Sequence, residues 1–238
     1  WYRDLANLQT DCARDVWQQF PQYRSLIHGF YTDLEESNLP DWYRSAKDLS
    51  DHYLNPIAED IKKQLSPRMK VWASPYAVYN FTLHNRTDAQ EHGQLLNATG
   101  YGHFWKSVLT AAPAFDFIAP QDSVGWMGNT LPEVRASLTA LRAAAATTTP
   151  PRQLWSNVEL FEGWPAGCWF PEQCGRHPGS MERIAAQINV GTSVHTAPKL
   201  GTAQACACPY YITIDLPVVC TRHRACGRYG TKHLEVNS

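Results

Sequence analysis

The chain has 238 residues and a mass of 26.9 kDa, which is enough to bury a full core in one large domain or two small ones. Hydrophobic residues make up 44% and charged residues 18%, as in a soluble globular protein. The net charge of -1 gives no general electrostatic basis for binding nucleic acid or an anionic membrane. No run approaches the roughly 20 apolar residues of a membrane span.

The chain begins at Trp1 without a visible signal peptide, so we expect a preceding segment to have been removed or to lie outside this sequence. Seven cysteines, and glycosylation sequons at Asn80, Asn85 and Asn97, favour an oxidising, secretory compartment. The sequence therefore predicts a secreted or extracytoplasmic glycoprotein.

The cysteines allow several interpretations. Cys168 and Cys174 have five residues between them in one loop and could close a small disulfide. A later group has a spacing loosely like a zinc site, although it contains no Cys-x-x-Cys pair: Cys206, Cys208, Cys220, His223 and Cys226. Disulfides, zinc binding and unpaired thiols all stay open, and we assign no metal and no cofactor.

The first elements expected are a helix, a strand and a second helix. Apolar residues recur at helical spacing over residues 4–19. Residues 25–32 have the length and residue types of a buried strand, and they lead into the acidic segment 33–36. A long helix is then expected over residues 40–65, where Ser66-Pro67 stops it.

The same strand and helix unit then repeats. The later elements expected are strands at 70–76, 115–120, 154–162 and 212–219, and helices at 100–111, 131–145 and 180–188. Alternation of this kind indicates a parallel sheet with right-handed crossovers. Because no Gly-x-Gly-x-x-Gly and no Walker motif follows a strand, a barrel is preferred over a nucleotide-binding open sheet.

The number of expected strands is too small for a complete barrel. Four clear strands and a fifth candidate stand against the eight that a (β/α)8 TIM barrel requires. We therefore expect a TIM-barrel-like α/β fold that is incomplete at the N-terminus, with about strands 4 to 8 present. Residues 1–195 would form the barrel portion, and residues 196–238 a Cys-rich C-terminal segment that could include the last barrel strand.

Polar residues gather at the C-terminal ends of the expected strands, where parallel folds bind their ligands. Glu35 follows the strand at 25–32, and Asp122 follows the strand at 115–120. The apolar stretch 154–162 carries Asn157 and Glu159, where a purely structural strand would prefer hydrophobic residues. These residues are the candidates for a functional site.

Three motifs carry a resemblance. Gly29-Phe30-Tyr31-x-x-x-Glu35, Ile118-Ala119-Pro120-Gln121-Asp122-x-x-Gly125 and Leu154-Trp155-x-Asn157-x-Glu159-x-Phe161 resemble, in that order, an uncharacterised family of TIM barrels known as a domain of unknown function. The family is grouped with the clan A glycoside hydrolases, which carry the acid/base after the fourth strand and the nucleophile after the seventh. The resemblance implies a glycosidase with Glu35 as acid/base and Glu159 as nucleophile.

Hydrolysis of a glycosidic bond requires two carboxyl groups, about 5 to 5.5 Å apart in retaining enzymes and about 6.5 to 9.5 Å apart in inverting ones. We expect the retaining mechanism, without a cofactor. Asn157 lies two residues from Glu159, so strand alternation points both side chains to one face. The other residues expected to bind the carbohydrate are Gln121 and Asp122, through sugar hydroxyls, and the rings of Tyr31, Trp72, Trp126 and Trp155.

Structural roles compete with each of these assignments. Large aromatic side chains often fill a core, and Asp122 could instead cap the loop that follows it. The alternative functions are a non-catalytic carbohydrate-binding or degenerate barrel, and an inactive fragment of a barrel enzyme.

Overall fold

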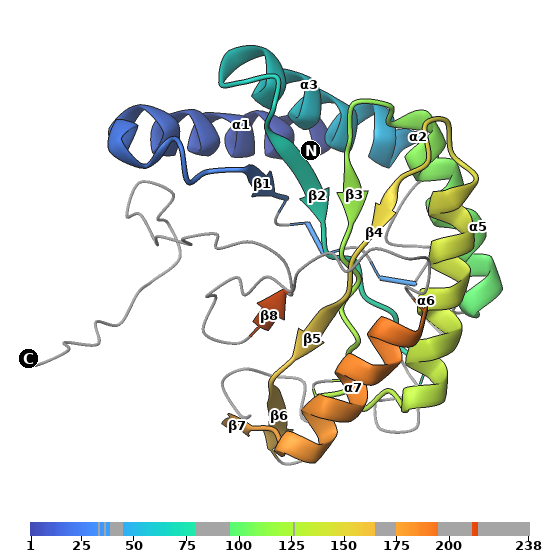
Figure 1. Cartoon of the computed structure of the whole chain (residues 1–238). Coiled ribbons are helices and arrows are strands. Elements are labelled where there is room, and N and C mark those ends of the chain that lie inside the picture. Colours follow the sequence, from blue (N-terminus) through green and yellow to red (C-terminus); the bar gives the residue numbers. More distant parts are fainter. Residues whose placement is uncertain are drawn as a thin grey trace, which may run out of the picture.

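The computed structural model describes residues 1–32, 34–35, 37–38, 45–79, 96–125, 127–164, 175–194 and 211–213. Its centre is a four-stranded parallel sheet in the order β1-β2-β3-β4 (Figure 1). The strands are β1 (Gly29–Tyr31), β2 (Lys70–Ala73), β3 (Phe117–Ile118) and β4 (Gln153–Leu154). The α/β class and the parallel sheet expected from the alternation of elements are confirmed.

Parallel pairing continues past the ends of these short strands. The Gln121 N–H donates to the Pro75 carbonyl oxygen at 2.8 Å, and the Asn157 N–H donates to the Pro120 carbonyl oxygen at 2.8 Å. Gln121 and Asn157 also form a parallel bridge with each other. The backbone that follows β2, β3 and β4 therefore keeps sheet geometry up to the candidate site residues.

The helices connect successive strands and pack on one another along the sheet (Figure 1). They are α1 (Tyr2–Gln19), α2 (Ala46–Leu49), α3 (Asn55–Gln64), α5 (Ala98–Ala111), α6 (Leu131–Ala146) and α7 (Met181–Val194), with a 3-10 turn η1 (Pro21–Tyr23) and a π-turn η3 (Ser50–Leu54). Helix α1 packs on α3, α5 on α6, and α6 on α7. Three of the expected helices, α1, α5 and α6, lie within two residues of the predicted bounds.

Local sequence signals explain where these helices begin. Thr130 and Glu133 form a reciprocal capping box at the start of α6, which also has a proline in its first turn. The Asn97 side chain accepts a hydrogen bond from the Gly100 N–H at 2.9 Å and caps α5. Both caps pair N–H groups that a helix cannot pair internally.

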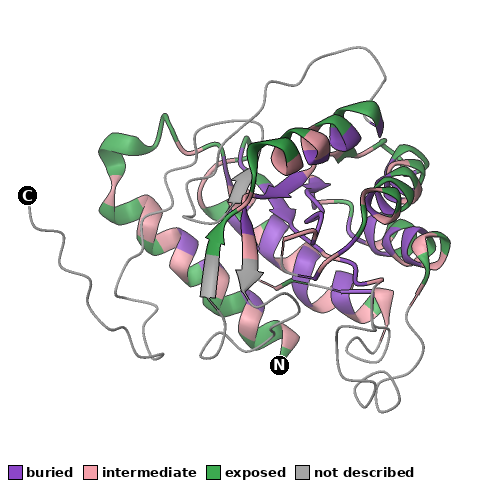
Figure 2. Ribbon diagram, turned by 90° about the horizontal axis from the view of Figure 1, so that it is seen from below, coloured by how far each residue is buried: buried purple, intermediate pink, exposed green. Residues whose placement is uncertain are grey.

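The hydrophobic core lies between the sheet and its helices. Figure 2 shows buried residues gathered at the centre, on inner strands and inward helix faces, and exposed residues on the outer faces of the helices. The largest side chains that are fully buried in this core come from five helical segments and the β3 region: Leu49, Tyr53, Leu54, Ile57, Ile61, Tyr101, Trp105, Leu109, Phe115, Ile118 and Leu141. The helices therefore bury one face of the sheet and leave the other to the site described below.

The long helix expected over residues 40–65 is not one regular helix. It consists of α2, the π-turn η3 and α3, and the Ser45 side chain caps α2 by accepting the Asp48 N–H. The Ser50 hydroxyl lies 2.7 Å from the Ala46 carbonyl oxygen and 3.0 Å from the Val108 carbonyl oxygen, which ties the π-turn to α5. The expected start at Pro40 lies outside the described residues.

The prediction of a single strand over residues 154–162 is wrong. After β4 the chain forms β5 (Asn157–Glu159) and β6 (Phe161–Trp164), which pair antiparallel with β8 (Tyr211–Thr213) and β7 (Gly175–Pro178). The partners lie far along the sequence, so apolar periodicity did not reveal the breaks. Of the strand expected at 212–219, the described part is β8.

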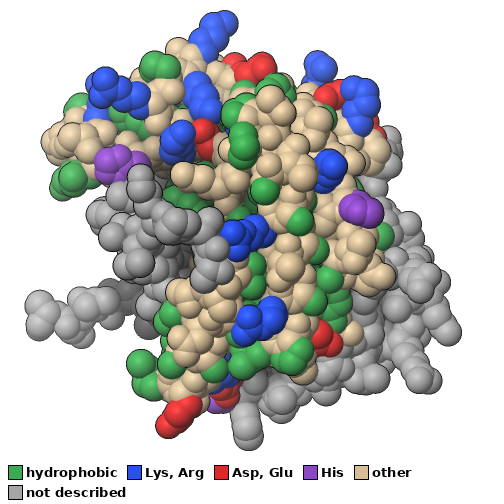
Figure 3. Space-filling model, turned by 45° about the vertical axis from the view of Figure 1, so that its right-hand side comes forward, with side chains coloured by type: hydrophobic (Ala, Val, Ile, Leu, Met, Phe, Trp, Pro, Cys, Tyr) green, Lys and Arg blue, Asp and Glu red, His purple; other side chains and the backbone are tan. Residues whose placement is uncertain are grey.

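Charged side chains are interspersed on the face drawn in Figure 3, where basic groups are scattered among uncharged ones rather than gathered in one patch. In the described part of the chain, no helix has the length and apolar character needed to cross a membrane. The predicted boundary at residue 195 stays a prediction, since of the residues beyond it only 211–213 are described.

The approach of β1 to β2 predicts that Gly29→Ala destabilises the fold. An added Cβ would lie 2.3 Å from the Lys70 carbonyl oxygen and 2.8 Å from a Trp72 ring carbon. We expect the free energy of unfolding to fall by about 1–3 kcal/mol in urea titrations. Gly100→Ala is the matched control, because its nearest neighbours are 3.3 Å away or farther. Equal stability of the two variants would contradict the prediction.

Candidate active site

A layer of polar side chains crosses the sheet on the face opposite the helices. The Asn157 Nδ2 donates to the Ser74 Oγ at 2.9 Å, and the Gln121 Nε2 donates to the Ser74 carbonyl oxygen at 3.1 Å. All three residues are buried. Since buried polar groups are stable only when they are hydrogen-bonded, each of these side chains has a fixed orientation.

Below this layer lies a row of aromatic rings, one from each of the four parallel strand regions. The Trp72 and Phe117 rings stack with centroids 5.3 Å apart, Phe117 lies 4.0 Å from Trp155, and Tyr31 lies 6.4 Å from Trp72. Trp72 is only 6% exposed, whereas Tyr31 is 41% exposed. Tyr31 therefore has ring surface accessible to a ligand, and the contacts of Trp72 favour a packing role.

Glu35 lies in an exposed position beyond the end of β1. The Tyr31 hydroxyl donates to the Glu35 Oε1 at 3.2 Å. The chain is fixed on both sides of Glu35: the Leu34 N–H donates to the Tyr53 hydroxyl at 3.2 Å, and the Asn38 Nδ2 donates to the Val78 carbonyl oxygen at 3.0 Å. These anchors hold the backbone around Glu35 against η3 and against the segment that follows β2.

Tyr76, which follows β2, is a second tyrosine near Glu35. Burial, and then the negative charge of Glu35, raise the pKa of the Tyr76 hydroxyl above its ordinary 10.0, while the hydrogen bond with Ser37 lowers it. The sequence reasoning missed Tyr76. Its position at the end of a predicted strand was the same signal that identified the acidic residues.

Glu159 is 2% exposed at the end of β5. Its N–H donates to the Asp122 Oδ1 at 3.3 Å, and its carbonyl oxygen accepts from the Gln187 Nε2 at 3.4 Å. A Cβ added at Gly125 would lie 3.1 Å from the Glu159 Oε2. The main chain of Glu159 is therefore held by side chains from the end of β3 and from α7.

Asp122 is 3% exposed, and its contacts are with protein groups. The Gln187 Nε2 donates to its Oδ2 at 2.5 Å, and the Val124 N–H donates to its Oδ1 at 3.3 Å. Burial raises the pKa of Asp122 from its ordinary 3.8 to about 6, although these hydrogen bonds, that of Glu159 and the charge of Arg183 lower it. Its contacts favour a positioning role, and binding of sugar hydroxyls stays a prediction.

The structure therefore brings most of the expected residues to the C-terminal end of one sheet. Trp126, the sequons at Asn80 and Asn85, and the cysteines from Cys168 onward lie outside the described residues. Asn97 is exposed, and its side chain caps α5. Within the described ranges, no group of three His, Cys, Asp or Glu side chains could bind a metal ion.

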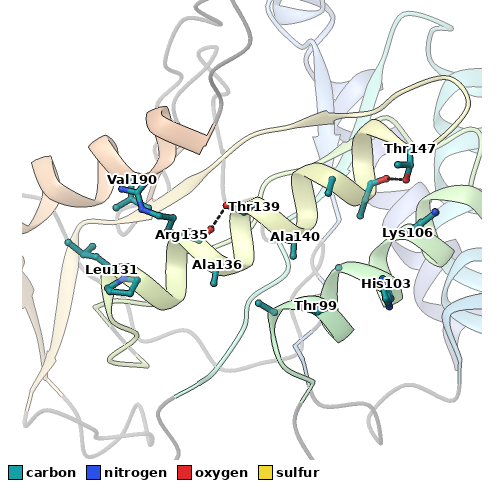
Figure 4. Close-up of a pocket in the computed structure, with 15 residues that line it drawn as sticks. Thr99, His103, Lys106, Leu131, Arg135, Ala136, Thr139, Ala140, Thr147 and Val190 are labelled. Carbon is teal, nitrogen blue, oxygen red and sulfur yellow. Dashed lines mark hydrogen bonds between the residues drawn. The ribbon is translucent and has the colours of Figure 1, made fainter.

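A groove of about 880 Å³ lies elsewhere, between α5 and α6 (Figure 4). Its lining includes Thr99, His103 and Lys106 of α5 and Ala136, Thr139 and Ala140 of α6. None of its lining residues is an acid, so this groove does not supply the carboxylates that glycoside hydrolysis requires. The candidate active site is the strand-end cluster instead.

The parallel sheet and its covering helices define an α/β protein. Its candidate site carries carboxylates at the C-terminal end of the sheet. The chain belongs to the family described as "Domain of unknown function (DUF4434)", whose model matches residues 1–200. This confirms the resemblance to an uncharacterised family that the three motifs indicated.

Structural comparison relates the fold to a glycosidase-like protein. The crystal structure of a "putative alpha-L-fucosidase" from Bacteroides thetaiotaomicron has a TM-score of 0.56 and 16% sequence identity to this chain. The similarity covers 77% of this chain and 48% of the other, so the chain spans about half the length of that protein. No curated protein sequence matches this chain.

The burial of Asp122 predicts a stability that depends on pH. The folded protein keeps the Asp122 proton up to pH about 6, whereas the unfolded chain loses it near 3.8. Between these values the folded state binds more protons, so its stability falls as the pH rises from about 4 to 7. Relative to Asp122→Asn, we expect a loss of about 2–3 kcal/mol across this range.

Urea titrations of the unmutated protein and of Asp122→Asn at pH 4.5, 5.5, 6.5 and 7.5 measure this difference directly. Groups that do not interact with Asp122 titrate alike in both proteins, so their effects cancel in the comparison. A difference that stays constant over this range would contradict the prediction.

Proposed function

We propose that this chain is the carboxylate-bearing part of a (β/α)8 barrel glycoside hydrolase that cleaves a polysaccharide or glycan with retention of configuration. The observation that carries the proposal is the buried carboxylate of Glu159, which lies at the C-terminal end of parallel strands beside an ordered polar layer. Membership in the family and the glycosidase-like fold of the neighbouring structure support the assignment.

In the proposed reaction a Glu159 carboxylate oxygen attacks the anomeric carbon and forms a covalent glycosyl ester. The glycosidic C–O bond breaks, and its oxygen takes the proton of Glu35. Water then gives a proton to Glu35 and attacks the anomeric carbon, which releases Glu159 and the product sugar. A fixed, buried nucleophile and an exposed acid that reaches both the leaving group and water suit these two roles.

The proposed mechanism requires a curved sheet. Three inter-strand steps of about 4.8 Å separate β1 from β4, or about 14 Å in a flat sheet. Retaining catalysis requires the two carboxyl groups within about 5.5 Å. Side chains that point to the inside of a closed barrel converge on its axis, so a barrel would bring Glu35 and Glu159 together. In such a barrel β1 to β4 would be the fourth to seventh strands.

The aromatic row is the proposed sugar-binding surface. Tyr31 offers an accessible ring face, Trp155 is half-buried, and Tyr31 also bonds Glu35. Aromatic faces pack on the apolar faces of sugar rings while the polar layer offers hydrogen bonds. The name of the similar structure makes α-L-fucosides one substrate class to test.

The proposal predicts release of reducing sugar from at least one substrate in a panel of polysaccharides, glycans and aryl glycosides that includes α-L-fucosides. Glu159→Gln should abolish turnover, because an amide cannot form the glycosyl ester. Glu35→Gln should lower kcat by about 100- to 10,000-fold on substrates with poor leaving groups.

Glu182→Gln is the matched control, because Glu182 is an exposed acid in the first turn of α7. Its turnover should equal that of the unmutated protein. Hydrolysis that survives in Glu159→Gln would overturn the assignment of the nucleophile.

A non-catalytic carbohydrate-binding barrel is the second candidate function. The specific observation in its favour is the exposed ring of Tyr31, which can bind a sugar without any turnover. Glycan binding that persists in Glu159→Gln, with no hydrolysis by the unmutated protein, would favour this candidate.

A further inference from the structure

The side chain of Gln187, on α7, contacts the main chain of the candidate nucleophile, Glu159. Its Nε2 lies 2.5 Å from the Asp122 Oδ2 and 3.4 Å from the Glu159 carbonyl oxygen, while the Asp122 Oδ1 accepts the Glu159 N–H at 3.3 Å. We propose that Gln187 is a positioning residue that fixes Glu159 for attack by orienting Asp122. This inference rests on the proposed function of Glu159.

The need to fill a buried space would not by itself select glutamine at position 187. Gln187 is 1% exposed, and its buried neighbours on α7 are Val190, Gly191 and Val194. An apolar side chain of similar size would fill the same space without burying an amide. The Gln187 Oε1 has no hydrogen-bond partner among the described residues. The contribution of this amide is therefore the hydrogen bond that its Nε2 donates to Asp122.

Arg183, one turn earlier on the same face of α7, has other partners. Its Nη2 donates to the Phe161 carbonyl oxygen at 3.0 Å, and its Nε lies 2.9 Å from the Glu162 Oε1. The charged groups around Gln187 are therefore Asp122 and Glu159 from the sheet, with Arg183 and Glu162 beside them. Because Arg183 is held at β6, Gln187 is the side chain of α7 that bonds Asp122.

The position of Glu159 matters because nucleophilic attack depends on close alignment. A displacement of about 1 Å can lower a rate by about 100-fold. Loss of the Gln187 donor would leave the Asp122 carboxylate free to turn away from the Glu159 N–H. The expected effect is a lower kcat with an unchanged KM, because the sugar-binding rings lie on other strands.

Gln187→Glu tests the donor directly. At pH 5 a protonated carboxyl group introduced at this position can donate to Asp122 again, and at pH 8 two carboxylates repel each other. Hydrogen–deuterium exchange over residues 157–161 should be at least 10-fold faster than in the unmutated protein at pH 8, and within about 3-fold at pH 5. Gln18→Glu, the same change at an exposed site on α1, should leave exchange unaltered at both pH values.

Gln187→Met is the second variant, because it removes the donor with little change in volume. Its exchange over residues 157–161 should be faster at both pH values, without recovery at pH 5. This variant keeps the test decisive if Gln187→Glu folds poorly. Exchange equal to that of Gln18→Glu in both Gln187 variants would overturn the positioning role.

Kinetics form the second arm, on a substrate identified by the panel. At pH 8, Gln187→Glu should lower kcat by about 10- to 100-fold with KM within about 2-fold, and kcat should recover at pH 5. A change in KM alone would overturn the inference. If no glycoside is hydrolysed, the proposed function fails, while the exchange measurements still decide whether Gln187 holds Glu159.

Discussion

A carboxylate buried where three elements meet constrains the functional end of this protein. Asp122 follows β3, and burial of its charge is tolerable only because donors converge on it from its own loop, from β5 and from α7. These bonds fix the Glu159 main chain after the sheet has lost its regular parallel pairing. The orientation of the candidate nucleophile therefore depends on Asp122, whose hydrogen bonds are with protein groups.

The two candidate acids are held in contrasting ways. Glu159 is buried and fixed through its main chain, whereas Glu35 is exposed and bonded through its side chain to Tyr31. A nucleophile must reach one atom, while an acid/base must exchange protons with a leaving group and with water. Burial of one acid and exposure of the other fit this division. Tyr31 links the exposed acid to the aromatic row, so the two parts of the proposed site are continuous.

The sequence predicted the fold better than the details of the site. Apolar periodicity identified the alternation of elements, but it could not show that the strand expected over residues 154–162 is divided into β4, β5 and β6, because β5 and β6 pair with β8 and β7 in the folded chain. The shared face expected for Asn157 and Glu159 stays a prediction, and the bond from Asn157 to Ser74 was not foreseen. Gln187 gave no signal, since its partners lie 28 and 65 residues away on other elements. Side-chain burial of this kind is decided by tertiary packing.

The most direct test of the account is to trap the glycosyl ester that it requires. The protein is incubated with a panel of 2-deoxy-2-fluoroglycosyl fluorides that includes the L-fucosyl compound, and the labelled peptide is identified by mass spectrometry. The account predicts one adduct per chain, on Glu159, and none in Glu159→Gln. An adduct on another residue, or turnover of a probe without an adduct, would contradict it.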